Sequence, residues 1–479
     1  MKKSCSFLLR VGLAFFAVGS VASAAVKLPS ILGNHMVLQQ GEPVPVWGWA
    51  DAGEKVTVTF HGKTVETKAD KAGKWQVRLP AMKANAKGAD LVVKGSNEIK
   101  LSDVLVGEVW LCSGQSNMEW TVARSANAKQ EIANAKHPLI RHVKVPHRPS
   151  DKPESDVKTS GWQVCSPSTA ASFTAVGYYF ARHLLKEIKV PIGLIGSNWG
   201  GTRIEPWIPP VGFQAVPALK KDFADKLDQF PNKRGNRIHH QSPLALYNGM
   251  ISPLLPYAIK GALWYQGESN NGEGTVYHEK MKALIAGWRS LWNKPGLPFY
   301  FVQLAPFRYG GDPKRLPGIW QAQLETLKVK NTGMAVTTDI TTLGDIHPPN
   351  KQDVGKRLAL WALAKNYGKN DLVYTGPLFE KTDYSDGGKG AITVRFQKHG
   401  KKHHGLKTTD RKKPTHFEIA GKDGVWHPAE ATIVYGDHLI LRSEKVKEPV
   451  NARFAWDQLA TPNLVNAVGL PASPFTTQK

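Results

Sequence analysis

The sequence predicts an α/β fold: a parallel sheet flanked by helices, with a β-sandwich-like portion before and after it. Two patterns carry this prediction. In the middle of the chain, short apolar strands alternate with helical runs such as 277–292 and 351–367, as in a parallel α/β sheet. Toward both ends, short alternating strands such as 56–60, 75–79 and 391–396 are separated by turns, which is typical of a β-sandwich.

The first 24 residues are expected to be a signal peptide. Lys and Arg residues precede an apolar run over 11–21, and small residues at 22–24 offer a cleavage site. We therefore expect the mature protein to begin at Ala25 and to be periplasmic or secreted. No later stretch reaches about 18 consecutive apolar residues, so membrane insertion is not expected.

The rest of the chain is too long for one hydrophobic core and predicts two or three domains. Residues 25–103 are expected to form an N-terminal β-rich domain, 104–370 a catalytic α/β domain, and 371–479 a C-terminal β-rich region. With the α/β domain inserted between them, the two β-rich regions could pack against each other.

Ser116 is the first candidate for catalysis because it follows an apolar strand at a tight turn. The run 104–111 indicates a buried strand, and Asn117 can open a helix. At such an elbow, backbone N–H groups at the helix start can receive an oxyanion. The common G-x-S-x-G pattern is not met, since Met118 occupies its last position. A lone serine after a strand is more often a turn residue.

Three further turns also follow an apolar strand and precede a helical stretch. They lie at 196–202, 266–270 and 344–349. Because the carboxyl ends of parallel strands share one edge of the sheet, ligands bind along that edge. We therefore expect these turns to converge on Ser116, bringing with them Gly200, Gln266 and His347.

His347 is the best candidate for a general base among the 16 histidines. It follows a strand and precedes two prolines that stiffen its turn. Asp345 lies two residues before it, close enough for a carboxylate to set the imidazole tautomer. Taken alone, a D-x-H sequence is weak evidence, because a loop histidine is more often solvated than catalytic.

Two sequence motifs resemble the first and last blocks of the SGNH esterases, and within them the sialate O-acetylesterase family. They are G-Q-S-N-M at 114–118 and D-I-H-P at 345–348. The resemblance covers most of the chain and implies an SGNH-hydrolase-like fold. It further implies that Ser116 attacks the acetyl carbonyl, that His347 takes its proton and later delivers it to the leaving sugar hydroxyl, and that Asp345 orients His347.

The resemblance also implies an oxyanion hole. Its donors would be the backbone N–H of Ser116, that of Gly200 or Gly201, and a side-chain amide. The superfamily supplies an asparagine in its third block, whereas this chain reads Tyr-Gln-Gly-Glu at 265–268. The amide is therefore assigned to Gln266.

Five residues near these turns are candidates for binding substrate: Gln115, Asn117, Trp199, Arg203 and Glu268. Arg203 could pair with a sugar carboxylate or be a solvated surface residue. Trp199 could stack on a sugar, although most tryptophans belong to the core. Glu268 could bind substrate hydroxyls, share the orienting role of Asp345, or be a helix-cap or surface carboxylate.

The formal net charge of +24 would concentrate anionic ligands, and acidic glycans fit this well. Nucleic acid is not expected, because no recognition motif is found. The chain has no H-E-x-x-H, paired C-x-x-C or EF-hand spacing, and the mechanism needs no metal or cofactor. Cys112 and Cys165 could form a disulfide in an oxidising compartment or remain free thiols.

These observations predict a secreted carbohydrate O-acetylesterase whose partner is an acetylated glycan. Sialic acid is the preferred substrate, with acetylated xylan or another plant polysaccharide as the alternative. A non-catalytic carbohydrate-binding protein is a third interpretation. The presence of Ser116, Asp345 and His347 together argues against it.

Overall fold

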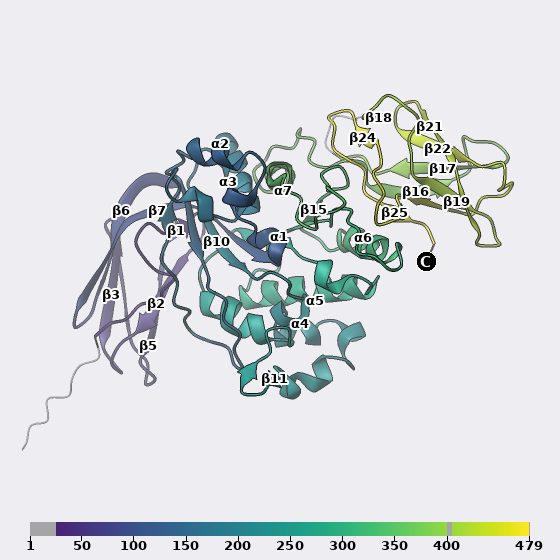
Figure 1. Cartoon of the computed structure of the whole chain (residues 1–479). Coiled ribbons are helices and arrows are strands. Elements are labelled where there is room, and N and C mark those ends of the chain that lie inside the picture. The colour runs from purple at the N-terminus through teal and green to yellow at the C-terminus, as the bar shows by residue number, and fades with distance from the viewer. Residues whose placement is uncertain (1–24, 400–404, 479) are drawn as a thin grey trace, which may run out of the picture.

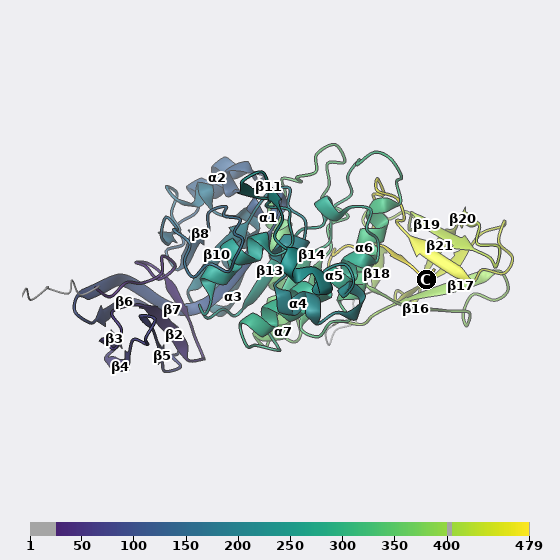
Figure 2. The same ribbon diagram turned by 90° about the horizontal axis from the view of Figure 1, so that it is seen from below.

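The structure is a computed structural model that describes residues 25–399 and 405–478. The predicted signal peptide, 1–24, lies outside the described residues. A β-rich region forms one end of an elongated molecule, an α/β domain its middle, and a second β-rich region its other end (Figures 1 and 2). Across the described ranges, no helix is both long and apolar enough to cross a membrane.

A sheet of parallel strands forms the centre of the α/β domain. Its order is β15-β14-β13-β7-β10-β8, and β9 adds an antiparallel edge strand. The central strands are buried along their length, as strands of a parallel sheet are when both faces are covered. The strands are β7 (Glu98–Gly114), β8 (Ile140–Lys144), β9 (Gln163–Val164), β10 (Ile192–Asn198), β13 (Gly261–Tyr265), β14 (Phe299–Val302) and β15 (Thr332–Ala335).

Helices cover both faces of this sheet. On β14, Phe299 contacts Trp288 of α5, whereas the next residue, Tyr300, donates a hydrogen bond to Asn366 of α7. Successive strand residues point to opposite faces, so α5 and α7 lie on opposite sides, which confirms the predicted α/β fold. The helices are α1 (Ser116–Glu119), α2 (Ala128–Ala133), α3 (Ala175–Ile188), α4 (Pro210–Gln214), α5 (Val276–Leu291), α6 (Arg315–Thr326) and α7 (Lys351–Asn366).

Strand β7 belongs to both the N-terminal region and the central sheet. Its first part pairs antiparallel with β6, and its last part pairs in parallel with β10 and β13. The predicted boundary between residues 103 and 104 therefore falls inside one continuous strand, not in a linker. The other N-terminal strands are β1 (Val37–Gln39), β2 (Val44–Trp49), β3 (Lys55–Phe60), β4 (Lys63–Lys68), β5 (Lys74–Leu79) and β6 (Asn85–Lys94).

The C-terminal region consists of two four-stranded antiparallel sheets and a short strand pair. Phe475 contacts Phe396 and so connects the two larger sheets. The strands are β16 (Phe379–Asp383), β17 (Ala391–Phe396), β18 (Leu406–Thr408), β19 (Phe417–Ala420), β20 (Trp426–Pro428), β21 (Glu430–Val434), β22 (His438–Arg442), β23 (Asn451–Phe454), β24 (Leu464–Asn466) and β25 (Phe475–Thr476).

The two β-rich regions lie at opposite ends of the molecule (Figure 1), so the suggestion that they pack together is wrong. The N-terminal region is built on β7, in the middle of the central sheet. The C-terminal region instead lies against α6 and the β14 side, where the Gln303 amide donates to Ser473 Oγ at 2.9 Å. Cys112 and Cys165 are both buried free thiols, so they form no disulfide.

Candidate active site

Ser116 is the first residue of α1, directly after the carboxyl end of β7. Only glycine fits two positions earlier, because Gly114 has a φ of +132° and a Cβ there would lie 2.2 Å from the Tyr265 carbonyl oxygen. Ser116 Oγ lies 2.9 Å from Nε2 of His347. The fold therefore brings the predicted nucleophile and base into hydrogen-bond contact, as acyl transfer through a serine requires.

Asp345 contacts His347 mainly through the backbone. Its Oδ1 accepts a hydrogen bond of 2.8 Å from the His347 N–H but lies 3.5 Å from Nδ1, too far for a strong hydrogen bond. The Asp345 side chain is 55% exposed, whereas that of His347 is 25% exposed. The structure thus brings the three predicted residues together, with a loose acidic partner for the imidazole.

The imidazole of His347 is held on one face by Trp120. Their rings stack at a centroid distance of 4.6 Å, and the Arg124 guanidinium lies over the same indole. Burial lowers the pKa of His347, and the charges of Lys351 and Arg124 lower it further against the opposing charge of Asp345. A lowered pKa keeps the imidazole neutral at pH 7, the form that can accept a proton.

Gly200 lies against the nucleophile, as the resemblance implies. A Cβ on Gly200 would lie 3.3 Å from Cβ of Ser116. Its N–H, however, donates a 2.7 Å hydrogen bond to Glu119 Oε2. In this structure the predicted oxyanion donor is therefore occupied, while the neighbouring Gly201 has a left-handed φ of +73°.

Glu119 is a residue that sequence reasoning missed. It ends α1, one turn after Ser116, and its Oε1 accepts hydrogen bonds from Lys144 at 3.0 Å and His147 at 2.7 Å. Burial alone would raise the pKa of Glu119, but the hydrogen bonds and charges of His147 and Lys144 lower it to about 2. The only local signal was its position one helical turn from the serine.

Gln266 is committed to a buried network. Its amide nitrogen donates to the Thr202 carbonyl at 3.1 Å and to Asn270 Oδ1 at 2.7 Å, and its oxygen accepts from Tyr277. An amide has two hydrogens, and both are used. This geometry contradicts the assignment of Gln266 to the oxyanion hole.

Gln115 supports the turn that follows β13, and its burial argues against the predicted contact with substrate. Its side chain is buried, and Oε1 accepts hydrogen bonds of 3.3 Å from the N–H groups of Gly267 and Ser269. Gln115 therefore joins the serine turn to the turn after β13.

Asn117 and Lys351 form a buried connection beneath the catalytic pair. Asn117 Nδ2 donates to Glu268 Oε1 at 2.5 Å and to the Ile346 carbonyl at 3.0 Å. Lys351 Nζ donates to Asn117 Oδ1 at 2.6 Å and to the Pro348 carbonyl at 2.7 Å. The two side chains thus hold the backbone on both sides of His347.

Glu268 and Lys351 are both buried ionisable groups. Burial raises the pKa of Glu268, and burial lowers the pKa of Lys351 to about 7. Among the residues that the structure describes, Glu268 Oε2 has no hydrogen-bond partner. Neither a substrate contact nor a surface carboxylate describes Glu268; its contact with Asn117 makes it part of the support beneath His347.

Arg203 is already paired within the chain. Its guanidinium donates to Glu205 at 2.9 Å, to Glu273, and to the Ser269 carbonyl. Lys280 shares the same two carboxylates. This network neutralises the charge of Arg203, which argues against Arg203 as the partner of a substrate carboxylate.

Trp199 is partly buried and lies between imidazoles. Its indole stacks on His147 with a ring-centroid distance of 4.3 Å and an interplanar angle of 2°. It also stacks on His240, with a centroid distance of 4.8 Å and an interplanar angle of 17°. A sugar could reach an indole face only by displacing one of these rings. In this structure both imidazoles therefore stack on Trp199, and its indole is not an open platform for a sugar.

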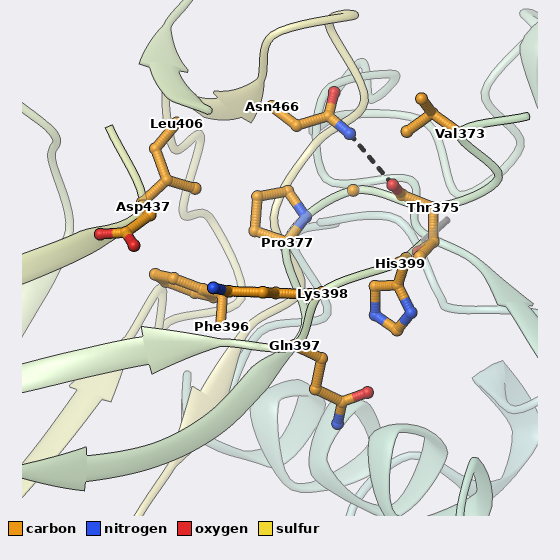
Figure 3. Close-up of a pocket in the computed structure, with 11 residues that line it drawn as sticks. Val373, Thr375, Pro377, Phe396, Gln397, Lys398, His399, Leu406, Asp437 and Asn466 are labelled. Carbon is orange, nitrogen blue, oxygen red and sulfur yellow. Dashed lines mark hydrogen bonds between the residues drawn. The ribbon is translucent and has the colours of Figure 1, made fainter. Parts of the chain in front are cut away.

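A small cavity of about 40 Å³ lies in the C-terminal region, away from the catalytic pair. Figure 3 shows it lined by segments around Thr375, Phe396, His399 and Asn466, whose amide donates to the Thr375 carbonyl at 3.0 Å. It contains neither Ser116 nor His347. Among the described residues, no cluster of His, Cys, Asp and Glu is placed to hold a metal ion.

Residues 106–364, just over half of the chain, match the family described as carbohydrate esterase, sialic acid-specific acetylesterase. The chain belongs to this family. The match confirms the predicted resemblance and covers the elbow of Ser116 and the turn of His347. Members of this family are ester hydrolases, and the chain is a carbohydrate O-acetylesterase.

Similarity to individual proteins extends over nearly the whole esterase. Sialate O-acetylesterase of Homo sapiens is 30% identical over 95% of this chain and 93% of its own length. That of Rattus norvegicus is 31% identical over 95% of both chains. A crystal structure of a carbohydrate acetylesterase from Xanthomonas citri is 38% identical, with a TM-score of 0.86, and covers 95% of this esterase and 100% of that chain.

Proposed function

We propose that this esterase removes O-acetyl groups from glycans through an acetyl-enzyme formed on Ser116. The observation that carries the proposal is the 2.9 Å contact between Ser116 Oγ and His347 Nε2 at the carboxyl edge of the sheet. A neutral imidazole at this distance is within reach of the serine proton.

In the first half-reaction, Ser116 Oγ attacks the acetyl carbonyl carbon while its proton passes to His347 Nε2. The tetrahedral intermediate collapses when His347 returns the proton to the sugar oxygen, which leaves as a hydroxyl. Water then attacks the acetyl-enzyme with His347 again as base, and acetate is released. Each proton taken from a nucleophile is returned to a leaving oxygen.

The oxyanion is assigned to the backbone N–H of Ser116 and to Gly200 or Gly201. Preorganised N–H donors stabilise the charge that develops on the carbonyl oxygen. The Gly200 N–H can serve only when Glu119 releases it, because the two are bonded at 2.7 Å. Asp345 is assigned the orienting role, through its contacts with the His347 backbone and imidazole.

Acetylated sialic acid is the substrate class that we propose first. The family description and the names of the curated relatives support it, as does the net charge of +24. Acetylated xylan is the alternative, and the pairing of Arg203 with Glu205 and Glu273 favours it, because that arginine is not available for a sugar carboxylate.

Measurements of acetate release test both the serine mechanism and the substrate class. The native enzyme, Ser116→Ala and the control Ser155→Ala, an exposed serine, would each be given O-acetylated sialic acid and an acetylated xylo-oligosaccharide. We expect release by the native and control enzymes only. Equal release by Ser116→Ala would refute the serine mechanism, and the preferred substrate separates the two glycan classes.

We further propose that residues 1–24 direct export, on the basis of their cationic start, apolar run and small-residue cleavage site. N-terminal sequencing of the protein recovered from the producing cells is expected to begin at Ala25. An intact Met1 in the exported fraction would contradict cleavage at this site.

A further inference from the structure

A row of rings leads away from the catalytic serine. It begins at His147, which is bonded to Glu119, and continues through Trp199 and His240 to His239. Successive ring centroids are 4.3, 4.8 and 5.4 Å apart. A ligand that follows the whole row must extend beyond the one sugar whose acetyl group lies at Ser116.

The row ends at a short hairpin made of β11 (Lys233–Arg234) and β12 (Arg237–Ile238). Gln241, just after the hairpin, connects it to the active site. Its amide nitrogen donates to the Gly201 carbonyl at 2.7 Å, and its oxygen accepts from the Arg203 N–H at 2.9 Å. The hairpin is therefore held against the turn that adjoins the nucleophile.

The hairpin presents three exposed cations: Lys233, Arg234 and Arg237. Within the part of the chain that the structure describes, none of them forms an ion pair with a carboxylate, in contrast to Arg203. Burial lowers the pKa of His240, and the charges of His239, Arg234 and His147 lower it further. The positive charge beside this part of the site is thus not compensated locally.

We propose that the β11–β12 hairpin is a subsite for the carboxylate groups of an acidic oligosaccharide whose acetylated sugar lies at Ser116. Guanidinium groups bind carboxylates in a bidentate manner. Exposed arginines are therefore suited to binding the carboxylates of charged sugars. The oligosaccharide would pass between the two points along the edges of these stacked rings. This inference rests on the proposed function and names the substrate class that the same site prefers.

The test compares a charged and an uncharged acetylated oligosaccharide of equal length. The variant Lys233→Gln/Arg234→Gln/Arg237→Gln is assayed with an O-acetylated oligogalacturonide and with an acetylated xylo-oligosaccharide. The ratio of kcat/KM for the charged substrate to that for the neutral one should fall about tenfold, as three exposed ionic contacts of modest strength would together produce. The fall should come from KM, and added salt should reduce the same ratio in the native enzyme.

The control removes the same charge elsewhere. Lys63→Gln/Lys68→Gln/Lys71→Gln neutralises three exposed lysines of the N-terminal region and should leave the ratio unchanged. If both triple variants lower the ratio equally, the preference arises from net charge and not from the hairpin, and the proposal is wrong. An unchanged ratio in the hairpin variant overturns it as well.

Binding without turnover separates this inference from the proposed function. Calorimetry with Ser116→Ala and an oligogalacturonide that carries no acetyl group should detect binding that the added hairpin substitutions weaken about tenfold. If the native enzyme releases acetate from no glycan, the proposed function fails, while this measurement still decides the subsite. Absence of binding, or binding that the hairpin substitutions leave intact, overturns the subsite.

Discussion

The buried ammonium of Lys351 donates a 2.6 Å hydrogen bond to the side-chain oxygen of Asn117, the residue that follows the nucleophile. Lys351 also binds the Pro348 carbonyl, and Asn117 binds the Ile346 carbonyl. The two backbone groups flanking His347 are therefore held from the serine side of the site. The position of the base therefore depends on this connection as well as on the exposed carboxylate of Asp345.

Lys351→Met is expected to lower kcat about 10- to 100-fold with little change in KM, because a small displacement of His347 impairs proton transfer more than binding. It should also lower the free energy of unfolding by about 1–3 kcal/mol, since the buried Asn117 Oδ1 loses its donor. Steady-state kinetics and urea denaturation measure the two effects. Lys356→Met, an exposed position on the same helix, is the control.

The double variant Lys351→Met/Glu268→Gln separates positioning from folding. Because Lys351 and Glu268 both bind Asn117, the stability losses of the two single substitutions should not add, whereas kcat should stay low because Pro348 has lost its donor. Recovery of kcat together with stability would mean that Lys351 acts only on folding.

Asp345→Asn is expected to lower kcat/KM by about tenfold or less, far below the roughly 10⁴-fold loss found where the acid of a triad binds the imidazole tightly. The reason is the 3.5 Å separation between Asp345 Oδ1 and His347 Nδ1. His347→Ala, assayed beside it, should abolish measurable turnover. A loss for Asp345→Asn as large as that for His347→Ala would show that the contact tightens when substrate binds.

The pH dependence of kcat/KM should follow His347. Burial lowers its pKa from 6.5, so the neutral base persists to lower pH than an ordinary histidine allows. We expect kcat/KM to be on its plateau at pH 7 and to decline only as the pH falls below about 6.5. A decline centred clearly above that value, or a profile with no acid limb down to the pH of unfolding, would contradict His347 as the base.

Glu119→Gln should destabilise the protein at neutral pH. The pKa of Glu119 is lowered from 4.5 to about 2, so the ionised carboxylate contributes stability that is present above pH 4.5 and lost as pH falls toward 2. A loss of about 2–3 kcal/mol at pH 7 is expected, and about half of that difference or less should remain at pH 3. Chemical denaturation at both pH values measures it.

The control for this measurement is Glu66→Gln, which removes an exposed ion pair with Lys55. Such pairs contribute about 0–1 kcal/mol, so this variant should unfold close to the native midpoint at both pH values. If Glu119→Gln behaves in the same way, the charge of Glu119 is not what holds Gly200 in place.

The α/β class and the approach of Ser116 to His347 were predictable from the amino-acid sequence. Both follow from local patterns: apolar runs form strands buried on both faces, and turns after parallel strands share one edge of the sheet. Helices α5 and α7 were likewise predicted from their periodicity. Each of these inferences needs only the local pattern of the segments concerned and a general rule of chain geometry.

The hydrogen-bond partners of the polar groups around Ser116 were not predictable from the sequence, because they depend on tertiary contacts. Gln266 has the right chemistry for an oxyanion donor, but Asn270 and Thr202 take both of its hydrogens. Glu119 occupies the Gly200 N–H, and Lys351 reaches Asn117 across 234 positions of the chain. Whether a side chain has a donor or acceptor left for substrate depends on partners that are distant in sequence. No local pattern encodes which of these partners it binds in the folded protein.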